Sequence, residues 1–420
     1  MKNKIKIGFI GLTHLGLNYL AATAQKKFSV IGVDISKSKI EKLKQNNIEY
    51  KEPYLKNTIL KNKKRILFSN NLKDLKKCNL VFVSQDVKTN AKGKSNVASL
   101  KFLIKKTIKN LNKKSVLIII SQIKPGFMRS INIDKKRLYH QVETLVFGNA
   151  IKRALHPERF MVGCQNKYNQ INKAYLSYLK SFHCPIIKMN YESAEIAKIS
   201  INVLLASSVT ATNVLSELCE KNSADWTDII PALKLDKRIG KFSYIKPGLG
   251  IAGGNIERDI VTTKDIFKKK TPPNLILGSI LENSKYMKNW TIRLLSKNNF
   301  LKKKRNIGIV GATYKENTNS IKNSPTITLI KNLNKKHKIE IYEPMLNLNI
   351  HNNKVIQIQS LSELIKQNEV IIFMRPWNLK KEIKNIYKYL RNKIILDPYR
   401  VIDFINRVNK TNSYFTLGKG

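Results

Sequence analysis

A glycine-rich stretch, "KPGLGIAGGNIERD" at residues 246–259, has the composition of a loop that presents side chains to a substrate. Its glycines allow the backbone to come close to a ligand. Asn255 stands where a nucleophile would be expected, and a carboxamide is not one, because its nitrogen lone pair is delocalised into the carbonyl. Alternatively, Asn255 only caps the helix that follows.

A second candidate site is "GLTHLG" at residues 11–16, where an apolar stretch turns into a segment with helical spacing. A dinucleotide-binding turn has glycine at three positions, and here Thr13 holds the second. Asp34 follows about 20 residues on, where a carboxylate binds a ribose 2′-hydroxyl and repels a 2′-phosphate. NAD is therefore favoured over NADP, although a purely structural turn remains an alternative. The predicted cofactor contacts here are Gly11, Thr13, Leu15, Gly16 and Asp34.

The order of elements predicts two doubly wound, Rossmann-like α/β domains joined by a central helical domain with a long spine helix. Short apolar stretches alternate with helical segments up to about residue 190, and the pattern returns after residue 305. Between them, residues 191–222 form a long helical segment with apolar residues on several sides. We expect domains at 1–190, 191–300 and 301–420. The predicted strands lie within 5–11, 28–36, 77–85, 114–122, 159–164, 184–190, 305–311, 338–344, 369–375 and 393–400.

The chain carries a formal net charge of +50, from 78 Lys and Arg against 28 Asp and Glu. Such a charge suits a nucleic-acid or membrane-surface protein, but the lysines are spread along the whole sequence without interleaved aromatic residues. We interpret the charge as a compositional bias that helps to recruit anionic substrates. No run of about 20 apolar residues or signal-peptide pattern is present, and the cysteines lack metal-binding spacing. We expect a cytoplasmic protein without a metal.

Nine stretches, taken in order, resemble the UDP-glucose/GDP-mannose dehydrogenase family. They include "GLTHLG", "NIEYKEP", "ISQIKPGF", "SAEIAKISIN", "KPGLGIAGGNIERD" and "GATYKENTNSIKNSP", and they cover nearly the whole chain. The resemblance implies an NAD-dependent enzyme with a Rossmann domain, a helical dimerisation domain and a nucleotide-sugar-binding domain. Members oxidise a sugar hydroxymethyl group twice to a uronic acid, which implies a role in polysaccharide or cell-surface sugar biosynthesis.

The resemblance assigns the family's catalytic groups to particular residues. Its glutamate corresponds to Glu143 and its lysine to Lys198. Its asparagine corresponds to Asn202, one helical turn further along the same face, and its aspartate to Asp259. A lysine would stabilise a developing alkoxide, and the glutamate would help water to hydrolyse a thioester. The family's nucleophilic cysteine is replaced by Asn255.

Other functional positions also follow from the resemblance. Substrate binding is implied for Arg238, Tyr244, Gly250, Lys315 and Lys322. Departures from the family pattern are Gln85 and Gln122 for cofactor-lining threonines, Glu257 for proline, Arg258 for lysine, and Asn319 and Ser320 for an acidic pair. We keep both glutamines as candidate cofactor contacts.

Asn255 leaves three hypotheses open, since thioester formation needs a thiolate. In the first, which we favour, the enzyme stops after one hydride transfer at an aldehyde or ketone, or reaches the acid through the aldehyde hydrate. In the second, the protein binds a nucleotide sugar or NAD without turnover. In the third, the basic surface binds nucleic acid. A homodimer through the central helix is expected.

Overall fold

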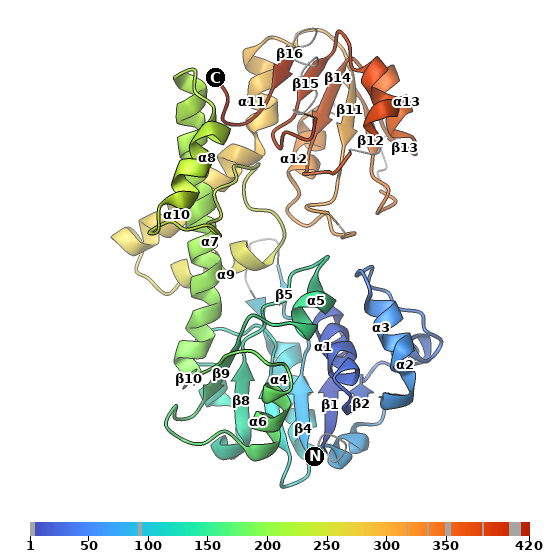
Figure 1. Ribbon diagram of the computed structural model, residues 1–420, viewed down its shortest axis with the longest axis vertical. Coiled ribbons are helices and arrows are strands. Elements are labelled where there is room, and N and C mark those ends of the chain that lie inside the picture. The colour runs from blue at the N-terminus through green and yellow to red at the C-terminus, as the bar shows by residue number, and fades with distance from the viewer. Residues whose placement is uncertain are drawn as a thin grey trace. The chain divides into compact units, whose positions relative to one another are not determined.

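The computed structural model describes residues 5–90, 95–316, 318–333, 336–348, 354–379, 382–402 and 413–420. The chain divides into two compact units, with the boundary between Ile201 and Asn202. Each unit contains a sheet, mostly parallel in the first (blue to green) and parallel in the second (orange to red) (Figure 1).

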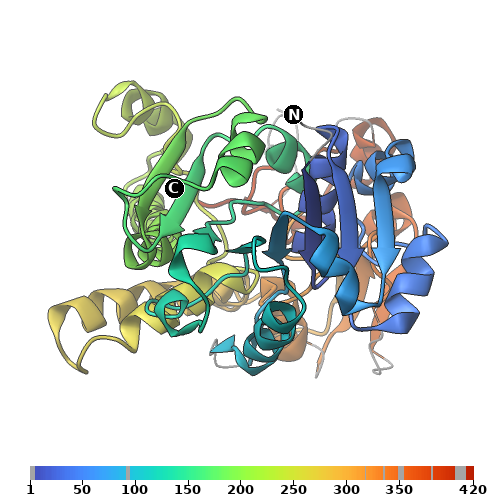
Figure 2. The ribbon, with the colours of Figure 1, turned by 90° about the horizontal axis from the view of Figure 1, so that it is seen from below.

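The N-terminal sheet has eight strands in the order β10-β9-β8-β7-β4-β1-β2-β3 (Figures 1 and 2). Neighbouring strands are parallel except β8 and β9. The chain runs outward from β1 in both directions, so the topological switch point lies between β1 and β4, where ligands bind in such sheets. The strands are β1 Lys6–Ile10, β2 Ser29–Val33, β3 Ile66–Ser69, β4 Leu80–Val83, β7 Val116–Ile119, β8 Leu138–Gln141, β9 Phe160–Cys164 and β10 Ile186–Asn190; a separate hairpin is formed by β5 Lys88–Thr89 and β6 Ser95–Asn96.

Helices cover both faces of this sheet, because its central strands are apolar along their whole length. One core contains α1, α5 and α6, and the core on the other face contains α4. Tyr175 and Tyr178 of α6 are completely buried. The helices are α1 His14–Gln25, α2 Lys37–Lys44, α3 Leu55–Lys61, α4 Ala98–Lys109, α5 Ala150–Leu155 and α6 Lys173–Lys180, with 3-10 turns at Lys63–Arg65, Leu72–Lys77, Met128–Ser130 and Lys135–Arg137.

Helix α7, Tyr191–Lys221, is 31 residues long and begins in the N-terminal unit. By length and composition it is the one helix, within the described ranges, that could cross a membrane. This is weak evidence, because the core helix of a soluble protein meets the same criterion. Its N-terminal part packs on the first sheet through Ala194, and Ala206 belongs to a core of the second unit.

The C-terminal unit has a parallel six-stranded sheet in the order β13-β12-β11-β14-β15-β16. Helices α10, α11 and α12 pack on one face and α13 on the other. The switch point lies between β11 and β14. The helices are α8 Trp226–Leu235, α9 Asn255–Lys264, α10 Pro272–Lys288, α11 Trp290–Lys297, α12 Pro325–Leu333, α13 Leu361–Gln367 and α14 Ile383–Ile386, with a 3-10 turn at Tyr387–Tyr389. The strands are β11 Asn306–Val310, β12 Lys338–Tyr342, β13 Val355–Ile358, β14 Val370–Phe373, β15 Ile394–Leu396 and β16 Ser413–Phe415.

The predicted fold class is confirmed, since two α/β regions enclose a helical region in the sequence. The structure groups that helical region with the second sheet in one unit, and the three-domain division stays a prediction. The sequence reading missed four strands that belong to the two sheets: β3, β8, β13 and β16.

Candidate active site

The turn after β1 requires both of its glycines. Gly11 has a φ of +83°, and a Cβ atom there would lie 3.0 Å from the backbone nitrogen of Gln85. At Gly16, a Cβ atom would lie 2.4 Å from Ser84 Oγ and 2.7 Å from the carbonyl oxygen of Gly11. Helix α1 therefore approaches the ends of β1 and β4 as closely as a dinucleotide-binding turn demands.

Thr13 explains how the turn tolerates a side chain at the second glycine position. Its hydroxyl donates a hydrogen bond to the carbonyl oxygen of Ser84 at 2.9 Å, which turns the side chain toward β4. Thr13 is also the N-cap of α1 and makes no side-chain capping bond. Leu15 is buried, so its side chain belongs to the core. The N-terminus of α1 thus keeps the form that suits a phosphate.

Asp34 lies at the end of β2 as predicted. Its Oδ2 accepts a hydrogen bond from Leu12 N at 2.9 Å and pairs with Lys39 Nζ at 3.0 Å. Its Oδ1 accepts from Ser36 N at 3.0 Å. A carboxylate offers about four acceptor sites, so capacity remains for a ribose hydroxyl. These residues fit NAD on geometry: a glycine cradle, a helix N-terminus and an acceptor.

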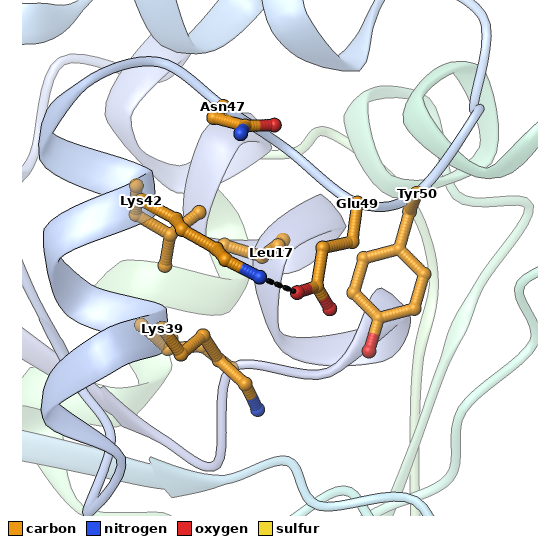
Figure 3. A pocket seen from close by; sticks show the side chains of 8 residues that line it. Leu17, Lys39, Lys42, Asn47, Glu49 and Tyr50 are labelled. Carbon is orange, nitrogen blue, oxygen red and sulfur yellow. Dashed lines mark hydrogen bonds and ion pairs between the residues drawn. The ribbon is translucent and has the colours of Figure 1, made fainter.

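A small pocket borders this turn at Leu12, and Figure 3 shows the side chains that line it. Lys42 Nζ and Glu49 Oε1 form an ion pair at 3.1 Å there, beside the ring of Tyr50. Burial, with the charges of Asp86 and Glu49, raises the pKa of Tyr50 to about 12, so its phenol stays neutral. The pocket includes none of the predicted catalytic residues. It is lined by Leu12, Leu17, Lys39, Lys42, Leu43, Asn47, Glu49 and Tyr50.

A second pocket, also in the N-terminal unit, brings together three of the predicted residues. Lys198 Nζ lies 3.0 Å from Glu143 Oε1, and both side chains are nearly buried. Glu143 follows β8, Lys198 lies on α7, and Gln122 follows β7. A buried ammonium paired with a carboxylate is a group able to stabilise negative charge on a substrate oxygen. The lining residues are Ile120, Ser121, Gln122, Ile123, His140, Val142, Glu143, Glu195 and Lys198.

Two residues of this pocket, Glu195 and His140, were missed. Glu195 accepts hydrogen bonds from the amides of Gly126 at 2.7 Å and Met128 at 2.8 Å, which fixes α7 against the segment after β7. Burial nevertheless raises its pKa. His140 Nδ1 lies 2.9 Å from the carbonyl oxygen of Ile119, so Nδ1–H must donate. Burial lowers the pKa of His140 to about 4, which keeps it neutral. Their positions in the sequence could have indicated them, because Glu195 lies three residues before Lys198 and His140 lies three residues before Glu143.

Glu52 is a third buried residue near the predicted positions that the sequence did not single out, although it lies in "NIEYKEP". Its carboxylate accepts from Gly148 N at 2.9 Å and Ala150 N at 2.8 Å, at the start of α5. It also accepts from His14 Nε2 at 2.7 Å. Burial alone would raise the pKa of Glu52, but the hydrogen bonds from His14 and the two amides bring it below its usual value. Glu52 thereby links the dinucleotide turn to the segment that follows Glu143.

The glycine-rich loop of the C-terminal unit is anchored by two helices. Gly248 N donates to Asn213 Oδ1 of α7 at 2.9 Å, and Ile251 N donates to Ser284 Oγ of α10 at 2.8 Å. Gly250 has a φ of +78°, and a Cβ atom there would lie 2.4 Å from the carbonyl oxygen of Ser284. Only glycine fits at that position.

The loop ends at the N-terminus of α9. Asn255 is the first helical residue and Gly254 is the N-cap, so the alternative of Asn255 as a cap is wrong by one residue. Asn255 is exposed. A Cβ atom at Gly254 would lie 2.8 Å from Lys322 Nζ, and the carbonyl oxygen of Lys322 accepts from Gly253 N at 3.0 Å. An ammonium group therefore lies beside a helix N-terminus.

Asp259 joins two side chains within the same unit. Asn202 Nδ2 donates to Asp259 Oδ2 at 2.6 Å, and Arg258 Nε lies 3.3 Å from Asp259 Oδ1. All three are buried. Arg258 Nη2 has no hydrogen-bond partner among the residues that the structure describes. The predicted pair Asn202 and Asp259 is thus in direct contact, and it includes a buried guanidinium.

The remaining predicted substrate residues are more dispersed. Arg238 is on the surface, with its side chain 90% exposed and its guanidinium 2.6 Å from Asp236. Tyr244 is also exposed. Lys315 Nζ lies 5.7 Å from the centre of the Tyr314 ring, and that ring would contact a Cβ atom at Gly253. Among the described residues, no group of acidic, His or Cys side chains is arranged to hold a metal.

Known proteins match all three parts of this chain, from the N-terminal sheet to the C-terminal one. Three profiles of the UDP-glucose/GDP-mannose dehydrogenase family match: the NAD binding domain at residues 5–181, the central domain at 192–285 and the UDP binding domain at 308–404. UDP-glucose 6-dehydrogenase of Rickettsia bellii is 26% identical over 436 residues, covering 99% of both chains. UDP-glucose 6-dehydrogenase TuaD of Bacillus subtilis is 25% identical over 433 residues, covering 99% of this chain and 93% of the relative.

Solved structures agree on the fold. A UDP-glucose dehydrogenase from Pyrobaculum islandicum has a TM-score of 0.84 at 18% identity, covering 100% of this chain and 98% of that one. The UDP-N-acetyl-mannosamine dehydrogenase of Staphylococcus aureus has a TM-score of 0.77, also at 18% identity, covering 98% of both chains. The three matching profiles and the full-length relatives confirm the resemblance noted above: the chain belongs to the UDP-glucose/GDP-mannose dehydrogenase family.

Proposed function

We propose that this protein is an NAD-dependent dehydrogenase that oxidises a hydroxyl group of a nucleotide sugar and stops after one hydride transfer. The enzyme class and NAD as cofactor are confirmed by the family match. The roles of single residues and the halt at the carbonyl are our proposals. So is a role in polysaccharide or cell-surface sugar biosynthesis, which the family resemblance implies.

The observation that carries the substrate assignment is the arrangement around Gly254. Lys322 Nζ and the N-terminus of α9 both present positive charge to the same point. Two like electrostatic features side by side favour a bound anion. Asn323 also holds the glycine-rich loop, since its Nδ2 donates to the carbonyl oxygen of Gly253 at 2.8 Å. A nucleotide diphosphate is an anion of the charge that this arrangement would bind.

The first oxidation removes a proton from the sugar hydroxyl and a hydride from its carbon. When bound, NAD accepts that hydride. Lys198 would hold positive charge near the hydroxyl oxygen, and Glu143, paired with it at 3.0 Å, would accept or relay the proton. Asn202 would donate a hydrogen bond, with its amide oriented by Asp259 at 2.6 Å. None of these roles needs a thiol.

The second oxidation is where the chain departs from thiol chemistry. Asn255 is exposed at the start of α9, and an amide cannot form a thioester. Burial raises the pKa of all four cysteines, that of Cys78 to about 12. A thiol with a raised pKa holds little thiolate at neutral pH, so these cysteines are poor substitutes for a nucleophile.

The test is to count NADH at 340 nm per sugar consumed, with purified protein, NAD and a panel of UDP- and GDP-sugars. We expect one NADH per sugar. In Asn255→Cys, whose thiolate would be favoured at a helix N-terminus, we expect two, whereas Asn255→Ala should stay at one. Two NADH from the unaltered protein would contradict the halt. Thermal shifts with both ligands but no NADH would support the alternative of a binding protein without turnover.

We also propose a cytoplasmic homodimer formed through α7. From Leu204 onward, this helix exposes a row of apolar side chains that a monomer leaves in water. Replacing Leu218 by Glu should shift the mass measured by light scattering from dimer to monomer. Leu67→Glu, at an exposed position on β3, is the matched control and should stay dimeric. Equal masses in the two variants would refute the α7 interface. The exposed residues are Leu204, Val214, Leu215 and Leu218.

A further inference from the structure

His14 is the first residue of α1, directly after the turn that follows β1, and its side chain is buried. Three side chains from two other segments surround its ring. Its Nε2 lies 2.7 Å from Glu52 Oε2. Its plane stacks on the ring of Phe147, with 4.0 Å between the ring centres and 19° between the planes. The ring of Tyr50 meets it edge-on, with 5.7 Å between centres. These contacts hold the imidazole in one orientation.

Two of the three contacts lead to the same stretch of chain, residues 144–150 between β8 and α5. Phe147 is part of this segment. Glu52 binds it through the amides of Gly148 at 2.9 Å and Ala150 at 2.8 Å. His14 therefore holds the segment directly by stacking and indirectly by a hydrogen bond. Without the His14 donor, a buried carboxylate would lose one of its charge-assisted hydrogen bonds.

The same segment fixes the carboxylate of Glu143, which directly precedes it. Glu143 Oε2 accepts a hydrogen bond from Leu145 N at 2.9 Å, and the carbonyl oxygen of Thr144 accepts one from Arg153 Nε at 2.8 Å. The other oxygen, Oε1, lies 3.0 Å from Lys198 Nζ. Since Glu143 is bonded to its own segment, a displacement of that segment would change its position relative to Lys198.

We propose that His14 is a positioning residue for the Glu143 carboxylate. It holds the 144–150 segment, through Glu52 and Phe147, on the path that places this carboxylate. The inference rests on the proposed function, in which Glu143 accepts or relays the proton of the substrate hydroxyl. Because His14 acts through other residues, its loss should lower the reaction rate more than the affinity for NAD. A shift of about 1 Å in a reacting group can cost about a hundredfold in rate.

The first experiment compares kcat for NADH formation with the Kd for NAD, measured by calorimetric titration of the full-length protein. We expect His14→Leu to lower kcat by about tenfold to a hundredfold and to leave the Kd nearly unchanged. His14→Gln keeps an N–H donor for Glu52 and should recover most of kcat. The matched control is His337→Leu, which removes a buried histidine of the C-terminal unit and should retain kcat. A Kd that rises as much as kcat falls would overturn the proposal, because His14 would then only shape the cofactor turn.

A double-mutant cycle tests whether His14 acts through Glu143. If it does, His14→Leu should lower kcat much less in a Glu143→Gln background than in the unaltered protein, because the positioned group is already lost. Equal fold-losses in the two backgrounds would contradict the proposal, since the two residues would then act independently.

Hydrogen exchange at the amides of Gly148 and Ala150 needs no substrate, so it separates this inference from the proposed function. We expect both amides to exchange about tenfold faster in His14→Leu, whereas the amides of α4, on the other face of the sheet, should keep their rates. Unchanged exchange at both positions would overturn the inference, whether or not NADH forms. Faster exchange in a protein that forms no NADH would support the hold on the segment and count against the proposed function alone.

Thermal melts show whether His14→Leu folds. If it does not, His14→Asn takes its place in each comparison, because the shorter amide cannot bring an N–H to the position of Nε2. The same outcomes then support or overturn the proposal.

Discussion

The turns after β1 and β11 are built on the same plan and end differently. Each has a glycine in the left-handed region, Gly11 or Gly311. Each also has a carboxylate at the end of the neighbouring strand that accepts the amide after that glycine. In the first turn, Asp34 accepts Leu12 N, and α1 begins at His14. In the second, Glu343 accepts Ala312 N, but α12 begins only at Pro325.

This difference decides what each turn can bind. Asp34 keeps acceptor capacity and faces a helix that starts at once, which suits a dinucleotide. Glu343 is filled by the turn, and Thr326 Oγ1 donates to the carbonyl oxygen of Gly311 at 2.9 Å, so the start of α12 bonds back to the turn. The residues inserted before α12 hold the glycine-rich loop instead. A shared topology therefore leaves the ligand open, and the turn's own side chains determine it.

The largest effect is expected when the charge of Glu343 is removed, because its oxygens already accept four hydrogen bonds. Glu343→Gln should destabilise the C-terminal unit by about 3–5 kcal/mol, because it leaves Arg375, whose Nη2 lies 3.6 Å from Glu343 Oε1, as an uncompensated buried charge. Asp34→Asn should leave this unit unchanged, since Asp34 belongs to the other one. All three tryptophans, Trp226, Trp290 and Trp377, lie in the C-terminal unit, so tryptophan fluorescence during urea unfolding reports on it alone. An unshifted fluorescence transition in Glu343→Gln would show that the ion pair adds nothing.

Acid should distinguish the N-terminal unit through His140. Its pKa is about 4 when folded and about 6.5 when unfolded. Between these values the unfolded chain binds a proton that the folded one does not, so stability falls as the pH falls. The loss attributable to His140 is about 3 kcal/mol from pH 6.5 to 4. His140→Asn keeps a donor for the Ile119 carbonyl and should flatten this part of the pH profile, measured by circular dichroism. An equally steep profile in the variant would contradict the assignment.

A substitution at Gly16 tests how closely α1 must pack against the turn after β1. In Gly16→Ala, the new Cβ atom meets Ser84 Oγ at 2.4 Å, and we expect a loss of about 1–3 kcal/mol in stability. The affinity for NAD should fall about tenfold or more, since α1 must move away from the phosphate site. Gly278→Ala, on α10 with its nearest neighbour at 3.6 Å, is the control. Unchanged NAD titrations in Gly16→Ala would place the cofactor elsewhere.

The smallest effect is expected at the cation beside Asp34. Lys39 is 28% exposed and pairs with Asp34 at 3.0 Å. Lys39→Met should cost about 0–1 kcal/mol, as for other accessible ion pairs, whereas the buried Glu343 loses several times that amount. A thermal melt suffices for this comparison. Similar losses from Lys39→Met and Glu343→Gln would mean that the two carboxylates are equally dependent on their cations.

Much of the fold follows from local patterns, because the central strands are apolar throughout and β4 and β7 are buried along their whole length. Strand β8, "LYHQ", escaped this reading because half of it is polar. Its burial depends on partners far away in sequence: His140 on the Ile119 carbonyl, and Gln141 Oε1 on the hydroxyl of Tyr175 at 3.0 Å. Hydrophobic periodicity cannot register such pairs.

The candidate site shows the same limit. The glycines and Asp34 could be placed from spacing, since a turn motif is local. The roles of Glu143 and Lys198 came from the family resemblance, and their contact of 3.0 Å became visible only in the structure. Glu195 accepts hydrogen bonds from two backbone amides, and so does Glu52 in addition to its bond with His14; backbone amides carry no residue type. No side-chain pattern could therefore have predicted those partners.

The long-range hydrogen bonds of Glu52 have a consequence for the order of folding. It receives the amides of Gly148 and Ala150, which lie 96 and 98 positions later in the chain. Helix α5 has six residues, too few to persist alone in water. The segment that carries Glu143 into α5 should therefore order late, after a long loop has closed. During synthesis, the dinucleotide turn would form first, and the segment that contains Glu143 would be among the last parts of this unit to become fixed.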